Sequence, residues 1–145
     1  MSGMLDTNIL VYAVNQEGPR HEPAKAYLSD LLASPGPWYL CWAIVYEFLR
    51  VVTHPKVFAS PLPWRDAWQF LEVLLGVPNV ELLYESEEHA EVLEMLLESV
   101  RNPSGNLMHD CHIAALLKEN GVGVLYTHDT DFRLFPFLKV IDPFE

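Results

Sequence analysis

Cysteine is scarce in this sequence, since only Cys41 and Cys111 occur among its 145 residues. The two lie far apart, each among apolar residues, and no CxxC pair is present. A disulfide framework needs more cysteines at short, regular spacings. We therefore expect two packed, reduced thiols.

Basic side chains are also few, with 9 lysines and arginines against 20 aspartates and glutamates and a net charge of −11. Proteins that hold nucleic acid on a broad basic face gain their affinity mainly by neutralising phosphates. The charge balance argues against that class. It leaves room for a nucleic-acid enzyme, because divalent cations bound by clustered carboxylates supply positive charge that meets a phosphate.

Long apolar runs are missing. The longest one, residues 38–46, is far shorter than the ~20 residues that a membrane span needs. The first residues show no basic segment, and an acid follows already at Asp6, so we expect no signal peptide. These features predict a soluble, cytoplasmic protein. Half the residues are hydrophobic and no repeat or linker divides the chain, which predicts a single domain over residues 1–145.

Short β-type runs alternate with longer helical patterns along the chain. The predicted strands are residues 3–5, 38–42, 80–84, 124–127 and 138–141, and the predicted helices are residues 8–15, 22–32, 43–53, 64–75, 87–101 and 106–119. This alternation is typical of an α/β fold with a parallel sheet covered on both faces. Gly36, Gly76 and Gly121 follow three of the helices, where a left-handed residue often ends a helix.

Two acids follow predicted strands directly or within a few residues. Asp6 follows the first strand and Asp129 the fourth, at the strand ends where open α/β sheets bind ligands. Thr127 is placed to hydrogen-bond a carboxylate and orient it. Asp6 is equally suited to be a helix N-cap. Asp131 is either a fifth acid of the site or the N-cap of a short helix at residues 132–135, and N-cap preferences favour the cap.

Glu47 interrupts an apolar helix face. It shares a stripe with Ile44, Phe48 and Val51 at helical spacing. Burying a carboxylate there is costly, so Glu47 needs a metal, a cation or a raised pKa. The alternative is an ion pair with a lysine or arginine.

Asp110 repeats this pattern on the last predicted helix, where it shares a stripe with Leu107, Cys111, Ala114 and Leu117. The alternative is an aspartate in the first helical turn, where the helix dipole favours negative charge. If the carboxylates crowd together, neutralising Asp110 or Glu47 is expected to stabilise the metal-free protein.

Together these acids predict a pocket rich in mutually repelling carboxylates. Hard cations such as Mg²⁺ or Mn²⁺ relieve that repulsion, because they prefer oxygen ligands and keep water in their coordination shell. A metal ion lowers the pKa of bound water and stabilises charge that develops on a phosphate. The hypothesis is thus a site for hard divalent cations. Its predicted catalytic and metal-binding residues are Asp6, Glu47, Asp110 and Asp129, with Asp131 as a further metal candidate and Asn8 and Thr127 in support.

These motifs resemble the PIN domains, and within them the VapC-type toxins of prokaryotic toxin–antitoxin pairs. Residues 5–10 resemble the family's opening motif, Glu47 its second acid, residues 110–115 its third and residues 127–129 its fourth. The resemblance covers nearly the whole chain. It implies a three-layer α/β/α fold, Mg²⁺- or Mn²⁺-dependent endoribonuclease activity on RNA, a homodimer, and inhibition by a cognate antitoxin.

Three other interpretations compete with this one. A zinc protein would use His109, His112, His128 and Cys111, but they lack motif spacing, and the histidines more simply flank the acidic pocket or the surface. A phosphatase of the haloacid-dehalogenase type needs Asp-x-Asp after the first strand, where this chain has Asp-Thr-Asn. The third is a catalytically inactive PIN-like module that binds RNA or protein.

The first half of the chain is rich in aromatic residues, which suit a core and an interface alike. Residues 58–68 contain Pro61 and Pro63, so we expect this segment to pack poorly by itself and to be covered in part by another chain. The expected partners are a second copy and an antitoxin segment that carries a basic residue to the carboxylates. Affinity for generic RNA should be low, and Arg50, Lys56 and Arg133 are the predicted phosphate contacts.

Overall fold

A computed structural model of the chain describes residues 1–145. Five short parallel strands form one sheet in the order β3-β2-β1-β4-β5. The strands are β1 (Gly3–Leu5), β2 (Trp38–Leu40), β3 (Val80–Leu82), β4 (Val124–Tyr126) and β5 (Lys139–Ile141). The helices are α1 (Thr7–Val14), α2 (His21–Leu32), α3 (Trp42–Val52), α4 (Trp64–Leu75), α5 (His89–Ser99), α6 (Asn106–Glu119) and the 3-10 helix η1 (Thr130–Leu134).

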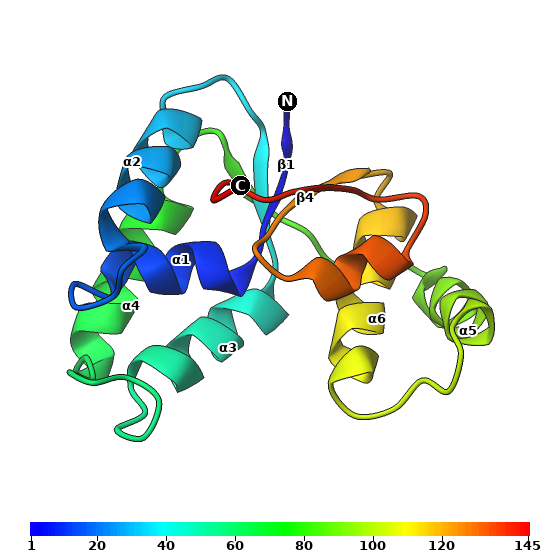
Figure 1. Ribbon diagram of the computed structural model, residues 1–145. Helices are drawn as coiled ribbons and strands as arrows, with labels where there is room; N and C mark the ends of the chain where they lie inside the picture. The colour runs from blue at the N-terminus through cyan, green and yellow to red at the C-terminus, as the bar shows by residue number, and fades with distance from the viewer.

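Helices cover both faces of the sheet. In Figure 1, α1, α2 and α4 lie to one side of β1, and α5 and α6 lie to the other. β1 is in the middle of the strand order and is buried along its whole length, as expected for a parallel strand covered on both faces. The fold is the three-layer α/β/α arrangement with a central parallel sheet that the sequence predicts.

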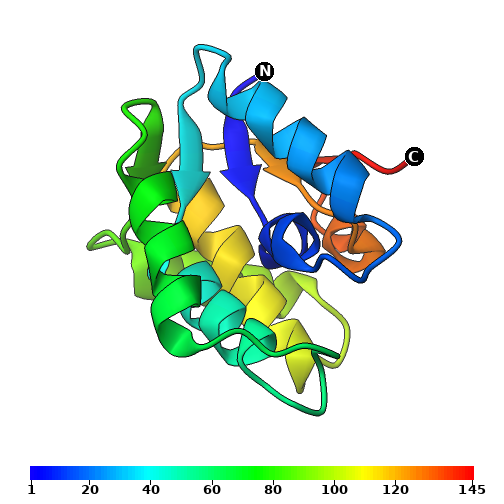
Figure 2. The ribbon, with the colours of Figure 1, turned by 90° about the vertical axis from the view of Figure 1, so that its left-hand side faces the viewer.

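The carboxyl ends of the strands point toward one end of the molecule. Figure 2 shows β1 and β2 directed toward the end where α3 and α6 lie. Leu5 of β1 pairs with Tyr126 of β4, so the residues that follow these two strands emerge side by side. This arrangement brings Asp6 and the segment after Tyr126 to the edge where ligands bind in open α/β sheets.

Every predicted strand and helix is present, with ends that differ by at most two residues. The second strand ends at Leu40 rather than at residue 42, because Cys41 is already the N-cap of α3. Gly36 and Gly121 have φ of 70°, in the left-handed region as predicted. The prediction for Gly76 is wrong, since its φ is −84°; its N–H instead donates to the carbonyl of Glu72 and continues the right-handed turn.

Cys41 and Cys111 are free and buried, which confirms the predicted packed thiols. None of the helices combines the length and apolar character that crossing a membrane requires.

The expectation for residues 58–68 is wrong in part. Phe58 and Ala67 are buried within the monomer, at 4% and 0% exposure. The backbone N–H of Leu62 donates to the carbonyl of Val52 at 2.8 Å, which ties the proline-rich segment to the end of α3. Trp64 within the segment and Val57 just before it remain 60% and 57% exposed, so part of the apolar surface here is uncovered.

Candidate metal centre

A cavity of about 250 Å³ opens at the carboxyl ends of β1 and β4. Two strands and two helices supply its acids: Asp6 follows β1, Asp129 follows β4, Glu47 lies on α3 and Asp110 lies on α6. The four acids predicted from the sequence therefore line one cavity. His109 lines it too, which places this histidine at the acidic pocket, one of the two locations considered for it.

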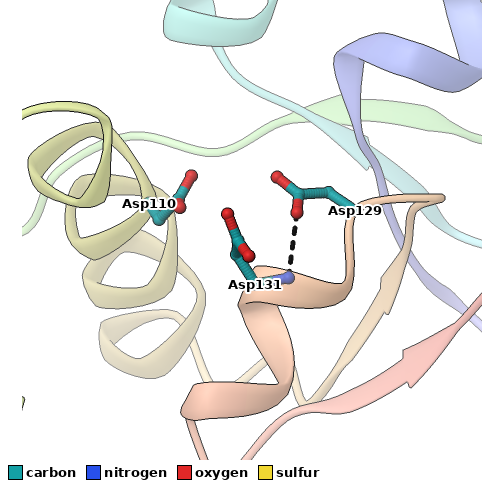
Figure 3. Close-up of side chains that lie close together, drawn as sticks. All are labelled: Asp110, Asp129 and Asp131. Atoms are coloured by element: carbon teal, nitrogen blue, oxygen red, sulfur yellow. Dashed lines mark hydrogen bonds between the residues drawn. The ribbon is translucent and has the colours of Figure 1, made fainter.

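Asp110, Asp129 and Asp131 form the tightest acidic group. Each offers one carboxylate oxygen, and these oxygens lie within 4.8 Å of one another. Figure 3 shows the three side chains turned toward a common space, Asp110 from α6 and the other two from the start of η1. An all-oxygen donor set of this size suits a hard divalent cation.

The predicted N-cap role of Asp131 is wrong, because Asp129 fills it. The Asp129 carboxylate caps η1 by accepting the N–H of Asp131 at 2.9 Å. The helix begins at Thr130, two residues earlier than expected, so Asp131 lies in its first turn. Its carboxylate is thereby left exposed and faces Asp110, which adds Asp131 to the acidic group.

Asp6 combines the two roles that the sequence left open. One carboxylate oxygen accepts the N–H of Thr7 at 2.8 Å and caps α1, and the other accepts the hydroxyl of Thr127 at 2.7 Å. The residue is 6% exposed. Burial raises the pKa of Asp6 above its usual value, against the two hydrogen bonds, and the charges of Glu47 and Asp129 raise it further.

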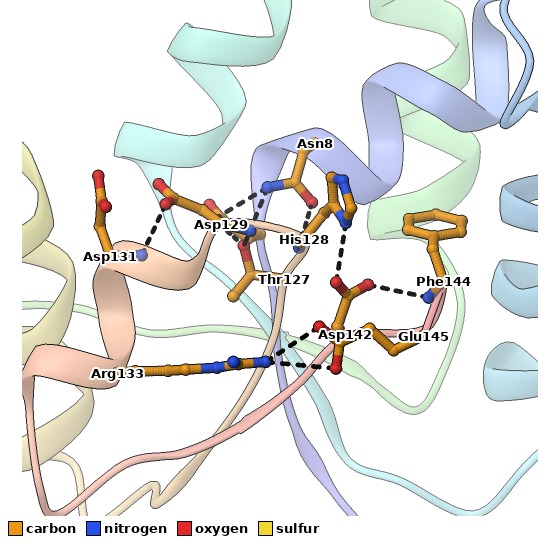
Figure 4. Close-up of polar contacts among 10 residues, drawn as sticks. Asn8, Thr127, His128, Asp129, Asp131, Arg133, Asp142, Phe144 and Glu145 are labelled. Atoms are coloured by element: carbon orange, nitrogen blue, oxygen red, sulfur yellow. Dashed lines mark hydrogen bonds and ion pairs between the residues drawn. The ribbon is translucent and has the colours of Figure 1, made fainter.

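Thr127 connects the ends of β1 and β4. Its buried hydroxyl donates to Asp6 and accepts from the side-chain amide of Asn8 at 2.9 Å and from the N–H of Asp129 at 3.0 Å. The Asn8 carbonyl oxygen accepts the N–H of His128 at 3.1 Å, which completes the network in Figure 4. These hydrogen bonds fix the backbone from which two of the acids project, as expected for supporting residues.

Asp110 is 7% exposed and is the fifth residue of α6, so the alternative of a first-turn acid does not apply. Burial raises its pKa to about 6, and the charge of Asp129 adds to the increase. A carboxyl group with a raised pKa loses its proton more readily when a bound cation stabilises the carboxylate.

Of the three ways to compensate the Glu47 carboxylate that the sequence left open, a metal, a cation or a raised pKa, the structure shows a contact with a side chain that can carry positive charge. Its carboxylate is only half-buried and lies 2.8 Å from Nε2 of His109, so its partner is a histidine and not the lysine or arginine of the alternative interpretation. The hydrogen bond to His109 lowers the pKa of Glu47, and the same contact raises the pKa of His109. The pair spans α3 and α6 at the rim of the cavity.

The zinc interpretation has no support in this geometry. His109 contacts Glu47, His112 contacts Glu85 at 2.9 Å, and His128 contacts Asp142 at 2.8 Å. The three imidazoles thus face three different carboxylates. The only group of three or more close metal-ligand side chains is the aspartate group Asp110, Asp129 and Asp131.

Two features of the site were not predicted from the sequence. The hydroxyl of Thr7 is buried in the cavity wall without a hydrogen-bond partner. A second, larger cavity of about 640 Å³ adjoins the aspartate group and includes Arg50. Arg50 is thus a suitable phosphate contact, whereas Arg133 is paired with Glu145 at 3.3 Å. Lys56 is exposed in the loop after α3.

The opposite pKa shifts of Asp110 and Glu47 predict opposite effects on the metal-free protein. A carboxyl group with a raised pKa binds its proton more tightly in the folded state, so its contribution to stability falls as pH rises from about 4 to about 6. Asp110→Asn removes this loss and should raise the free energy of unfolding at pH 7 by at most about 3 kcal/mol. Glu47→Gln removes a favourable pair and should lower it by less than about 1 kcal/mol.

Urea unfolding in chelator at pH 4 and pH 7 measures both effects. The gain from Asp110→Asn should disappear at pH 4, where the wild-type carboxyl group is protonated in the folded state. If Glu47→Gln stabilises the protein at pH 7, the Glu47–His109 pair is not favourable. The result would then agree with the sequence-based expectation that neutralising Glu47 relieves repulsion.

Comparison with known proteins places this geometry in a family. Residues 3–138 match the PIN domain family. The chain is 35% identical over 144 residues to Ribonuclease VapC48 of Mycobacterium tuberculosis, with 99% of each sequence covered. It is 34% identical over 138 residues to Ribonuclease VapC33 of the same organism, with 95% of each covered.

Solved structures share the fold at lower sequence identity. VapBC-1 from nontypeable Haemophilus influenzae is similar with a TM-score of 0.65 and 20% identity, over 100% of both chains. Mycobacterium tuberculosis VapC20, described as a sarcin-ricin loop cleaving toxin, is similar with a TM-score of 0.64 and 20% identity, over 96% of this chain and 98% of that one.

Proposed function

The chain belongs to the PIN domain family, and we propose that it is a divalent-metal-dependent endoribonuclease that acts as the toxin of a toxin–antitoxin pair. The observation that carries the proposal is the convergence of Asp110, Asp129 and Asp131 at the mouth of a cavity that also contains Asp6 and Glu47. Relatives that align over almost the whole chain are named ribonucleases, which supports RNA as the substrate.

The residues present fit Mg²⁺ or Mn²⁺. Asp110, Asp129 and Asp131 would hold the ion most directly, and Asp6 and Glu47 line the smaller cavity together with Asp110 and Asp129. All five offer carboxylate oxygens, which these ions prefer over the nitrogen and sulfur ligands typical of structural zinc sites. The raised pKa of Asp110 and Asp6 reflects crowding and burial that a bound cation would relieve.

When bound, the ion supplies a more acidic water and stabilises charge on the phosphate. The protein's own residues organise the surroundings. Thr127 and Thr7 hold the Asp6 carboxylate in one orientation. The hydroxyl of Thr127 also accepts a hydrogen bond from the backbone N–H of Asp129. The contact with Glu47 raises the pKa of His109 and so favours its protonated form at the rim, and Arg50 offers its charge to the phosphate from the larger cavity.

Cleavage of RNA by the purified chain tests this function. We expect endonucleolytic products from a single-stranded RNA in Mg²⁺ or Mn²⁺, no products in excess chelator, and recovery when the metal is returned. Release of phosphate from a small phosphomonoester without RNA cleavage would contradict the proposal and favour a phosphatase. Mapping the RNA ends produced in cells would identify the target.

We also propose a homodimer and an antitoxin partner. Similar solved structures include one described as a toxin–antitoxin complex, from Klebsiella pneumoniae. Val57 and Trp64 leave apolar surface exposed, and the net charge of −11 suits a basic inhibitory segment. Light scattering that finds only monomer at high concentration would remove the dimer. A neighbouring open reading frame whose product neither binds the chain nor suppresses cleavage would remove the antitoxin.

A further inference from the structure

The solvent side of α3 carries aromatic and basic side chains in a line. Trp42, Tyr46 and Arg50 are four residues apart, so they share one face of the helix over about 12 Å. Trp42 is 39% exposed, Tyr46 is 69% exposed and Arg50 is also exposed. We name these three residues the α3 stripe.

The α3 stripe adjoins the candidate metal centre. Tyr46 and Arg50 line the larger cavity together with all three residues of the aspartate group. Glu47, the residue after Tyr46, lines both cavities. A nucleotide whose phosphate lies at the aspartates therefore has Tyr46 and Arg50 within its immediate surroundings.

Packing does not account for Tyr46. Its ring is supported on one side by the indole of Trp42, with ring centroids 6.4 Å apart and the planes tilted by 49°. More than half of the side chain nevertheless faces solvent, whereas aromatic rings are usually buried for stability. A supported ring with an open face has the geometry of a surface on which another flat ring can stack.

We propose that Tyr46, backed by Trp42, is the stacking platform for an unpaired base next to the bond that is cut, while Arg50 contacts a flanking phosphate. This inference rests on the proposed ribonuclease function. Stacking on aromatic side chains binds single strands regardless of sequence. It also supplies affinity that nine basic residues in a chain of charge −11 do not provide. A base within a duplex is already stacked on its neighbours, so the platform selects single-stranded RNA.

Kinetics of the full-length protein on one single-stranded RNA test the platform. Tyr46→Ala should raise KM about 10-fold, in line with the loss of one stacked base, and leave kcat unchanged. Tyr46→Phe should behave as the wild type, because the ring is retained. Tyr84→Ala is the matched control, since Tyr84 is 57% exposed and lines neither cavity. An abasic nucleotide at the stacked position should raise KM for the wild type and add nothing in Tyr46→Ala.

Two binding measurements separate this inference from the ribonuclease proposal. An RNA with 2-aminopurine near the cleavage site should lose fluorescence on binding to the wild type and to Tyr46→Phe, but not to Tyr46→Ala. This readout needs no cleavage, so quenching by a protein without ribonuclease activity would contradict only the proposed function. If Tyr46→Ala quenches the fluorescence as strongly as the wild type and has the same KM, the platform is overturned. It is also overturned if the only change in Tyr46→Ala is a shift from dimer to monomer in light scattering.

Discussion

Asp129→Asn is expected to lower the rate of metal-dependent RNA cleavage by at least about 1000-fold, because a lost metal ligand removes several kcal/mol of charge stabilisation. The protein should remain folded. Asparagine caps helices as well as aspartate, and its side-chain oxygen can still accept the N–H of Asp131. The substitution therefore removes a negative charge from the aspartate group with little change in local structure. Initial rates at saturating Mn²⁺, together with a thermal melt, measure both parts.

Asp30→Asn is a suitable control, since Asp30 is exposed on α2, outside the acidic cavities, and the substitution changes the net charge by the same amount. Its cleavage rate should match the wild type. Calorimetric titration should show weaker Mn²⁺ binding for Asp129→Asn alone. Full activity of Asp129→Asn at limiting metal would remove Asp129 from the metal site.

The positions of the strand-end acids could be predicted from the sequence because a parallel sheet imposes them. Once β1 and β4 are adjacent, the residues that follow them must emerge at the same edge. The position of Asp6 could therefore be predicted without any knowledge of side-chain packing. Asp110 and Glu47 were recognisable because each interrupts an apolar helical stripe, and α6 and α3 both reach that edge.

The contacts between elements could not be predicted in the same way. The pairing of Glu47 with His109 depends on how α3 approaches α6, and no local pattern encodes that approach. The capping of η1 by Asp129 rather than Asp131 has a different cause: both are good caps, and the backbone after β4 decides where the helix begins. The sequence indicated that Thr127 follows a strand and can orient a carboxylate. It did not show that its one hydroxyl has three hydrogen-bond partners.

That shared hydroxyl makes Thr127→Val the substitution with the largest expected effect on stability. Valine keeps the shape of threonine but removes the hydroxyl that donates to one oxygen of the Asp6 carboxylate and that accepts from the Asn8 amide and the Asp129 N–H. The other Asp6 oxygen keeps the N–H of Thr7. The contact to Asp6 is buried and the other two are half-buried. An unpaired buried group costs about 1–3 kcal/mol and a half-buried one less, so the free energy of unfolding should fall by roughly 2–4 kcal/mol. Urea unfolding of the metal-free protein at pH 7 measures this loss, which is a large part of the stability of an average domain.

Thr127→Ser is the matched variant, because serine retains the hydroxyl and loses only a buried methyl group, worth about 1 kcal/mol. The difference between the valine and serine variants therefore isolates the hydrogen bonds. The Thr127 hydroxyl also lowers the pKa of Asp6, so the valine variant should bind Mn²⁺ less well than the serine variant, and increasingly so as pH falls. If the valine variant is as stable as the wild type, only the serine variant loses stability, and the two bind metal equally at pH 6, packing of the methyl group, rather than the hydroxyl network, holds the ends of β1 and β4 together.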